Sequence, residues 1–244
     1  MTRVFIDGAH GTTGLEIAER LAGRPGLDLI SLDEDRRKDT EARRDAINAA
    51  DVVILCLPDD AARDSVALID NDRTRVIDAS TAHRTDLAWT FGLPELVGRD
   101  VVAASKRVSN PGCYSTGFIA LLAPLVKAGL LPSDWPYVCN AVSGYSGGGK
   151  AMIAEFEGGT AATAWRTYAL SLSHKHVPEM QVRCGLHYPP LFSPSVAATQ
   201  RGMIVEVPLM TSAMPGKPSA DALRAAKRAL DPDGLLNPGV LIDP

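Results

Sequence analysis

The sequence predicts an α/β protein: a doubly wound domain with a parallel sheet, followed by a second α+β domain with a mixed or antiparallel sheet. In the first half, short aliphatic runs alternate with stretches of helical period. A glycine-rich turn joins the first such run to the first helical stretch. We place the first domain at residues 1–112, an apparently truncated second domain at 113–210 and an atypical tail at 211–244.

The expected elements follow in chain order. The predicted strands of the first domain are residues 4–6, 29–32, 52–57, 76–77 and 101–103, with a helix at 15–21. The second domain is expected to contain a long apolar helix at 115–128 and strands at 137–142, 163–176 and 202–208. A loop with Pro189, Pro190 and Pro194 separates the last two strands, and a short helix at 221–230 precedes a turn-rich end.

Composition excludes several classes of protein. The 244 residues are 45% apolar and 22% charged, which is unlike a disordered chain or a disulfide-dense miniprotein. With 25 basic and 29 acidic residues the net charge is −4 and there is no long basic stripe, so nucleic acid is not expected as a partner. No secretory signal or long apolar run is apparent, and we expect a cytoplasmic protein without a membrane partner.

The turn at residues 7–14, Asp-Gly-Ala-His-Gly-Thr-Thr-Gly, predicts a Rossmann-type dinucleotide site. Glycine lets the backbone approach a pyrophosphate, and the helix amino terminus offers free N–H groups to the anion. A tight turn without a ligand is the alternative. The expected cofactor contacts are Gly8, His10, Gly11, Thr12, Thr13, Gly14, Arg36, Arg37 and Pro58.

The choice of nicotinamide cofactor depends on residues 33–38, Asp-Glu-Asp-Arg-Arg-Lys. An acid at a strand end favours NAD, whereas Arg36 and Arg37 could pair with the 2′-phosphate of NADP. A solvated charge run is a further interpretation of the segment.

Cys113 is the candidate nucleophile among four cysteines. It follows the turn Ser-Asn-Pro-Gly at 109–112 and precedes the apolar helix, so the helix dipole and free N–H groups favour a thiolate there. Cys56 and Cys139 lie in apolar strand candidates and are expected to be buried hydrophobes. The alternative is that Cys113 has no catalytic role and only occupies a position in a Pro-Gly turn.

A proton-transfer partner is expected from His174 and His176, which would point the same way in an extended strand. One alternative is a metal site completed by Cys184 or His187, although the spacing matches no strong pattern, and another is a solvated histidine pair on a strand edge. The glycine-rich stretch 143–150 combines amides, hydroxyls and Lys150, which suits an oxyanion or phosphate pocket; a flexible surface loop is the alternative.

Taken together, six segments resemble the short form of N-acetyl-γ-glutamyl-phosphate reductase, a relative of aspartate-semialdehyde dehydrogenase. They are residues 8–14, 76–84, 92–95, 109–114, 142–150 and 176–179, in the family's order over about residues 1–210. The resemblance implies NADPH-dependent reduction of N-acetyl-L-glutamyl 5-phosphate to the 5-semialdehyde in arginine biosynthesis, in a chain expected to be a homo-oligomer. It implies Cys113 as nucleophile, His176 as acid/base and NADP, with NAD possible, at the glycine turn. Residues expected at the substrate are Arg84, Asn110, Ser143, Gly147, Lys150 and Glu179.

We expect the likeness to this family to stop after residue 208. Residues 227–239 instead resemble the carboxyl-terminal end of FAD-linked oxidases, although a segment this short does not imply FAD. Two alternatives therefore accompany the main interpretation: a catalytically impaired remnant that binds nucleotide or other chains, and an aspartate-semialdehyde or aminoadipate-type reductase.

Overall fold

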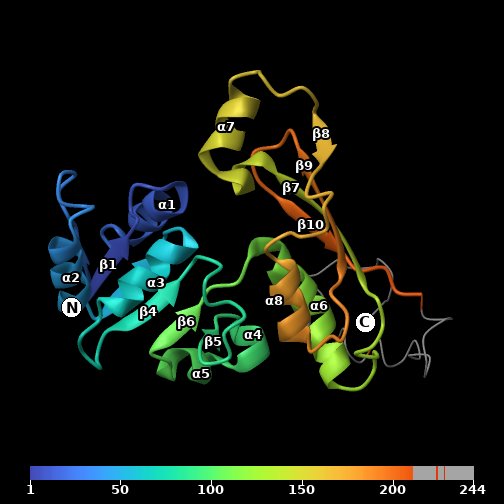
Figure 1. Cartoon of the computed structure of the whole chain (residues 1–244), viewed down its shortest axis with the longest axis horizontal. Helices are drawn as coiled ribbons and strands as arrows, with labels where there is room; N and C mark the ends of the chain where they lie inside the picture. The colour runs from blue at the N-terminus through green and yellow to red at the C-terminus, as the bar shows by residue number, and fades with distance from the viewer. Residues whose placement is uncertain (211–223, 225–227, 229–244) are drawn as a thin grey trace. The chain divides into compact units, whose positions relative to one another are not determined.

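The computed structural model describes residues 1–210 together with 224 and 228. The chain divides into two compact units, Met1–Gly112 and Cys113–Pro244. Figure 1 labels helices and strands of both units. The predicted helix at 221–230, apart from residues 224 and 228, and the rest of the tail lie outside the described residues. Within the described part of the chain, no helix is long and apolar enough to cross a membrane.

The first unit is a parallel six-stranded sheet in the order β2-β1-β3-β4-β6-β5. Its strands are β1 (Thr2–Asp7), β2 (Leu27–Ile30), β3 (Val52–Leu55), β4 (Arg75–Asp78), β5 (Thr90–Phe91) and β6 (Arg107–Ser109). Its helices are α1 (Thr12–Leu21), α2 (Thr40–Ala49), α3 (Asp59–Ala67), α4 (Pro94–Val97) and α5 (Arg99–Ala104). The doubly wound prediction for this half is confirmed.

The sheet order reverses between β1 and β3, which lie side by side. At such a reversal the loops after the two strands diverge and leave a crevice at the carboxyl ends of the strands. Apolar side chains of β3 and α2, including Val53, Leu55 and Ile47, are almost fully buried beneath it. The fold therefore places the glycine turn after β1 and the segment after β3 at one end of a rigid core.

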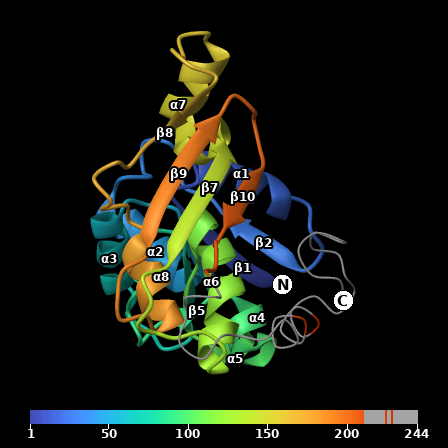
Figure 2. The same ribbon diagram turned by 90° about the vertical axis from the view of Figure 1, so that its right-hand side faces the viewer.

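The described residues of the second unit form a mixed four-stranded sheet in the order β10-β7-β9-β8. β7 (Val138–Gly144) is parallel to β9 (Leu191–Ala197), whereas β10 (Met203–Glu206) and β8 (Trp165–Thr167) are antiparallel to their neighbours. Helices α6 (Cys113–Lys127) and α8 (Val177–Cys184) lie beside each other (Figure 1), and β7, β9 and β10 face the viewer in Figure 2. Between β7 and β8 the chain forms a short 3-10 turn, η1 (Tyr145–Gly148), and helix α7 (Gly149–Glu157).

Three sequence assignments are wrong. Residues 101–103, predicted as a strand, lie in α5. Of the predicted strand at 163–176, only β8 (Trp165–Thr167) is a strand in the structure. His176 is instead the N-cap residue of α8. The stretch at 189–194 was predicted as a loop because of its prolines, but Pro194 lies within β9. Pairing with β8 begins at Ser195, one residue after it.

Candidate active site

In the turn after β1, backbone atoms lie too close to two glycines to leave room for a side chain. Gly8 has a positive φ of 92°, and a Cβ there would lie 2.4 Å from the carbonyl oxygen of Cys56. A Cβ on Gly14 would lie 2.3 Å from the carbonyl oxygen of Gly8. Thr12 and Thr13 are the first two residues of α1, and Gly11 is its N-cap. The turn therefore presents bare backbone and a helix amino terminus, which suits the pyrophosphate of a dinucleotide.

A cavity of about 630 Å³ opens beside this turn, entirely within the first unit. Of the residues predicted to bind cofactor, Gly8, His10, Gly11 and Arg37 line it. Thr12, Thr13, Gly14, Arg36 and Pro58 do not line it; Pro58 is the N-cap of α3.

The end of β2 bears on the choice of cofactor. Ser31, Arg37 and Lys38 line the cavity, whereas the acidic residues at 33–35 are absent from its lining. A hydroxyl and two cations complement a phosphate. The carboxylate of the lining, Asp7, is held by Arg43, and Glu34 forms an ion pair with Arg37 at 3.5 Å. The cavity thus fits the 2′-phosphate of NADP better than the free ribose of NAD.

A third cation of the cavity, Arg43, is held by the protein. Its guanidinium donates to the carboxylate of Asp7 at 3.0 Å and to the hydroxyl of Ser65 at 2.6 Å. Ser65 also donates to Asp7 at 2.8 Å. Asp7 is only 4% exposed, so this pairing neutralises a buried carboxylate directly before the glycine turn.

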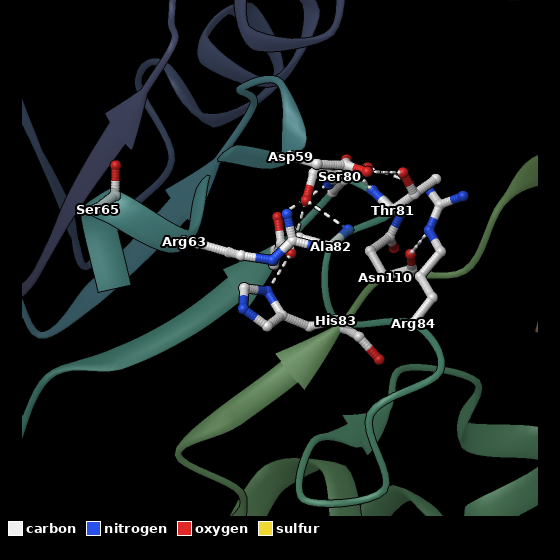
Figure 3. Close-up of polar contacts among 12 residues, drawn as sticks. Asp59, Arg63, Ser65, Ser80, Thr81, Ala82, His83, Arg84 and Asn110 are labelled. Atoms are coloured by element: carbon white, nitrogen blue, oxygen red, sulfur yellow. Dashed lines mark hydrogen bonds and ion pairs between the residues drawn. The ribbon is translucent and has the colours of Figure 1, made fainter. Parts of the chain in front are cut away.

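The loop after β4 is anchored at both ends (Figure 3). Asp78, fully buried, accepts hydrogen bonds from the Ser80 hydroxyl at 2.8 Å and from the His83 ring at 2.7 Å. Arg84 is 7% exposed and donates to the main-chain oxygens of Asn110 at 2.9 Å and Ala79 at 3.0 Å. Arg84 and Asn110, both predicted at the substrate, are therefore brought together. The contact steadies the turn that leads to Cys113.

Burial distinguishes the four cysteines, all of which lie in the described residues. Burial, with the nearby carboxylates of Asp78 and Asp7, raises the pKa of Cys56 to about 11. Burial raises the pKa values of Cys139 and Cys184 to about 12. Cys113 is exposed and is the first residue of α6. It is therefore the cysteine that is both accessible and placed at a helix amino terminus.

Tyr114, the residue after Cys113, contacts both of the predicted histidines. Its ring lies edge-on to His174 at 6.5 Å and to His176 at 6.0 Å between centroids, and it is 2% exposed. His174 and His176 are themselves in edge contact at 4.6 Å. The expected histidine pair is thus next to the start of α6. No group of three His, Cys, Asp or Glu suited to a metal ion occurs in the described residues.

The glycine-rich stretch 143–150 contacts Tyr114 through the side chain of Ser143. The Tyr114 hydroxyl donates to Ser143 Oγ at 2.7 Å, and a Cβ on Gly147 would lie 3.9 Å from that oxygen. Lys150 is exposed in the first turn of α7. Ser143 and Gly147 are therefore close together, and Ser143 is bonded to the residue beside Cys113.

Glu179, expected at the substrate, is buried in the structure. It is 1% exposed, and its Oε2 accepts a hydrogen bond from Ser115 Oγ at 2.6 Å. Its carboxylate is therefore directed at α6, two residues beyond Cys113.

Comparison with known proteins gives the family. The profile described as "Semialdehyde dehydrogenase, NAD binding domain" matches residues 3–104, and "Semialdehyde dehydrogenase, dimerisation domain" matches residues 113–229. The chain is 54% identical over 226 residues to N-acetyl-gamma-glutamyl-phosphate reductase 2 of Pseudomonas putida, covering 91% of this chain and 72% of that protein. It is 52% identical to the N-acetyl-gamma-glutamyl-phosphate reductase of a Chelativorans species, covering 92% and 73%. The chain belongs to the N-acetyl-γ-glutamyl-phosphate reductase family.

Solved structures support the fold of this reductase family member. Aspartate semialdehyde dehydrogenase II from Vibrio cholerae aligns with a TM-score of 0.58 at 16% identity, covering 92% of this chain and 78% of that one. Aspartate semialdehyde dehydrogenase with NADP from Candida albicans aligns with a TM-score of 0.58 at 14% identity, covering 93% and 76%. The predicted two-part fold is confirmed, and so is the resemblance to N-acetyl-γ-glutamyl-phosphate reductase.

Sequence reasoning on this reductase missed several residues that the structure brings to the candidate sites. Ser31, Lys38 and Arg43 line the cavity, and Tyr114 and Tyr168 lie at the start of α6. Tyr114 could have been noticed because it adjoins Cys113. Tyr168 carries no such signal, because 54 residues separate it from Tyr114.

Proposed function

We propose that this chain reduces N-acetyl-L-glutamyl 5-phosphate to N-acetyl-L-glutamate 5-semialdehyde, with release of phosphate and consumption of NADPH. The observation that carries the proposal is 54% identity, over 91% of the chain, to a reductase of that name. The accessible Cys113, whose neighbour Tyr114 contacts a histidine pair, and the phosphate-binding character of the cavity support it.

In the proposed reaction, the Cys113 sulfur attacks the acyl carbon. A C–S bond forms, the C–O bond to phosphate breaks, and phosphate leaves with the bonding electrons. His176 accepts the thiol proton and returns it when the sulfur is released. NADPH, when bound, would supply the hydride that reduces the thioester to an anionic tetrahedral adduct, whose C–S bond would then break to give the aldehyde and release the Cys113 sulfur.

The cofactor proposal rests on the residues of the first unit. Gly8 and Gly14 leave room for the pyrophosphate, and Arg37 and Lys38, with Ser31, would hold the 2′-phosphate of NADP. The proposed substrate contacts are Arg84, Asn110, Ser143, Gly147, Lys150 and Glu179.

The assembly and location are part of the same proposal. The second unit matches a family profile described as a dimerisation domain, and Ile204 of β10 is 62% exposed and Trp165 of β8 is 55% exposed. Apolar side chains this exposed suit an interface with a second copy of the chain. Light scattering of Ile204→Glu should show a smaller assembly than the parent chain. We also propose a cytoplasmic location, which subcellular fractionation would check.

The reverse reaction tests the activity: phosphate-dependent reduction of NADP in the presence of N-acetylglutamate semialdehyde. The parent chain should turn over, Cys113→Ser should not, and both should bind NADPH. Cys184→Ala is the matched control, because the Cys184 thiol is buried and takes no part in the proposed reaction. A folded parent chain that binds NADPH without turnover would refute the proposal and favour a nucleotide-binding role. Preference for aspartate semialdehyde would favour the other branch of the superfamily.

A further inference from the structure

His174 is hydrogen-bonded to the main chain that carries His176. The His176 main-chain N–H donates to Nδ1 of the His174 ring at 3.1 Å, and the two rings are 4.6 Å apart between centroids. The carbonyl oxygen of His174 accepts from the next N–H along the chain, that of Val177, at 2.9 Å. His174 therefore pairs with the N–H groups of both the N-cap and the first residue of α8.

The bond at Nδ1 defines the state of the His174 ring. A ring nitrogen that accepts a hydrogen bond carries no proton, so the ring is neutral and its proton lies on Nε2. Burial, followed by the charge of Lys175, lowers the pKa of His174 and so favours this neutral form at neutral pH. The acceptor at Nδ1 is thus present under the conditions in which the chain would work.

Aromatic side chains from three other segments of the second unit surround the His174 ring. It lies edge-on to Tyr114 of α6 at 6.5 Å, to Tyr168 after β8 at 6.0 Å and to Phe192 of β9 at 5.1 Å between centroids. Packing on these sides limits the rotation of the ring. Its Nδ1 is therefore kept toward the His176 N–H.

The main chain of His176 has an unusual conformation for its position. An N-cap residue ordinarily has extended backbone angles, whereas His176 has the helical angles φ −82° and ψ −17°. His176 is also 4% exposed, so its N–H would be costly to bury without the acceptor that His174 provides. The bond between the two residues therefore stabilises the backbone angles that set the direction of the His176 side chain.

We propose that His174 is a positioning residue: its Nδ1 holds the main chain of His176 in the orientation from which the His176 imidazole accepts and returns the proton. The acid/base part of this statement rests on the proposed function, whereas the hold on the His176 main chain does not. In this role His174 exchanges no proton and accepts one hydrogen bond. An acid/base group must lie within hydrogen-bond reach of the proton it moves, so a small change in direction slows the reaction.

Two substitutions separate the acceptor from the ring. His174→Leu keeps an apolar side chain without an acceptor, whereas His174→Asn supplies an oxygen that can accept from the N–H two residues on, as in an Asx turn. His174→Leu should lower kcat about tenfold or more, with KM changed less than about twofold, because the acid/base group is misdirected while substrate contacts remain. His174→Asn should recover most of the lost kcat.

Two NMR measurements need no turnover. In the parent chain, the imidazole nitrogen-15 shifts of His174 should show a proton on Nε2 and none on Nδ1. Hydrogen exchange of the His176 amide should be faster in His174→Leu than in the parent and remain slow in His174→Asn. The matched control is His187→Leu, the same substitution at an exposed histidine of the same unit, which should leave kcat and this exchange unchanged.

Several results would overturn the proposal. They are a proton on Nδ1 of His174 in the parent chain, a parental kcat in His174→Leu, and unchanged exchange of the His176 amide in that variant. A kcat in His174→Asn as low as in His174→Leu would also do so, because the ring itself would then be needed for the reaction. If the parent chain shows no turnover, the proposed function fails, and the two NMR measurements alone decide whether His174 holds the main chain of His176.

Discussion

Ser115 donates a hydrogen bond from its hydroxyl to Oε2 of Glu179 at 2.6 Å, and the two side chains are 0% and 1% exposed. Ser115 lies two residues after Cys113 in α6, and Glu179 lies three residues after His176 in α8. This bond therefore ties together the first turns of the two helices that present the proposed nucleophile and the proposed acid/base.

Ser115→Ala should destabilise the chain by about 1–3 kcal/mol, because it removes a hydrogen-bond donor from a buried carboxylate. Urea unfolding followed by circular dichroism measures the loss. Adding Glu179→Gln should recover part of it, since a neutral amide costs less to bury than a carboxylate. The control is Ser171→Ala, whose hydroxyl bond to Ser173 is exposed. Equal stability of Ser115→Ala and the parent would contradict this account.

Arg37→Ala should raise the KM for NADPH about tenfold while leaving the KM for NADH nearly unchanged, because only NADPH carries the 2′-phosphate. Steady-state kinetics with both cofactors measures the difference. Arg36→Ala is the matched control, since Arg36 adjoins Arg37 in sequence but is absent from the lining of the cavity. An equal rise in KM for both cofactors would mean that Arg37 contacts a part of the dinucleotide other than the 2′-phosphate.

Gly14→Ala should abolish NADPH binding and destabilise the first unit by about 1–3 kcal/mol. The added methyl group meets the Gly8 oxygen at 2.3 Å and the Ala9 Cα at 2.8 Å, and neither backbone atom can move without shifting the turn. Gly11→Ala is the control for folding, because its Cβ would have no neighbour closer than 3.4 Å. Thermal unfolding with and without NADPH distinguishes the variants. A Gly14→Ala chain stabilised by NADPH as much as the parent would refute the steric argument.

Stability should fall as the pH drops below about 6.5, and His174 should contribute to the slope. Burial, together with the charge of Lys175, lowers the pKa of His174 from 6.5 in the folded chain. Below that pH the unfolded chain binds the proton more readily than the folded chain, so protonation favours unfolding. His174→Gln should flatten this part of the curve.

Urea midpoints across a pH series test this dependence on His174. The exposed His187, changed to Gln, is the control and should leave the slope as it is in the parent. An unchanged slope in His174→Gln would mean that other groups account for the acid sensitivity.

Local patterns were enough to predict much of the fold. The alternation of apolar runs with helical stretches identified the parallel sheet, since its adjacent strands β1, β3 and β4 each contain successive apolar residues. The apolar stretch after Cys113 identified α6. The errors fell where tertiary contacts outweigh local signals: Pro194 is held within β9 by pairing of its neighbours, and the prolines around it hid the strand.

The candidate site divides in the same way. The glycine turn, Cys113 and the histidine pair are predicted from the sequence, because each depends on a short segment whose chemistry is readable from neighbouring residues. The folded structure was needed to show that Glu179 is directed at Ser115, that Arg37 rather than Arg36 lines the cavity, and that Tyr168 contacts Tyr114. These relationships join segments distant in sequence or depend on where a side chain points, and they exist only once the packed sheets and helices fix both.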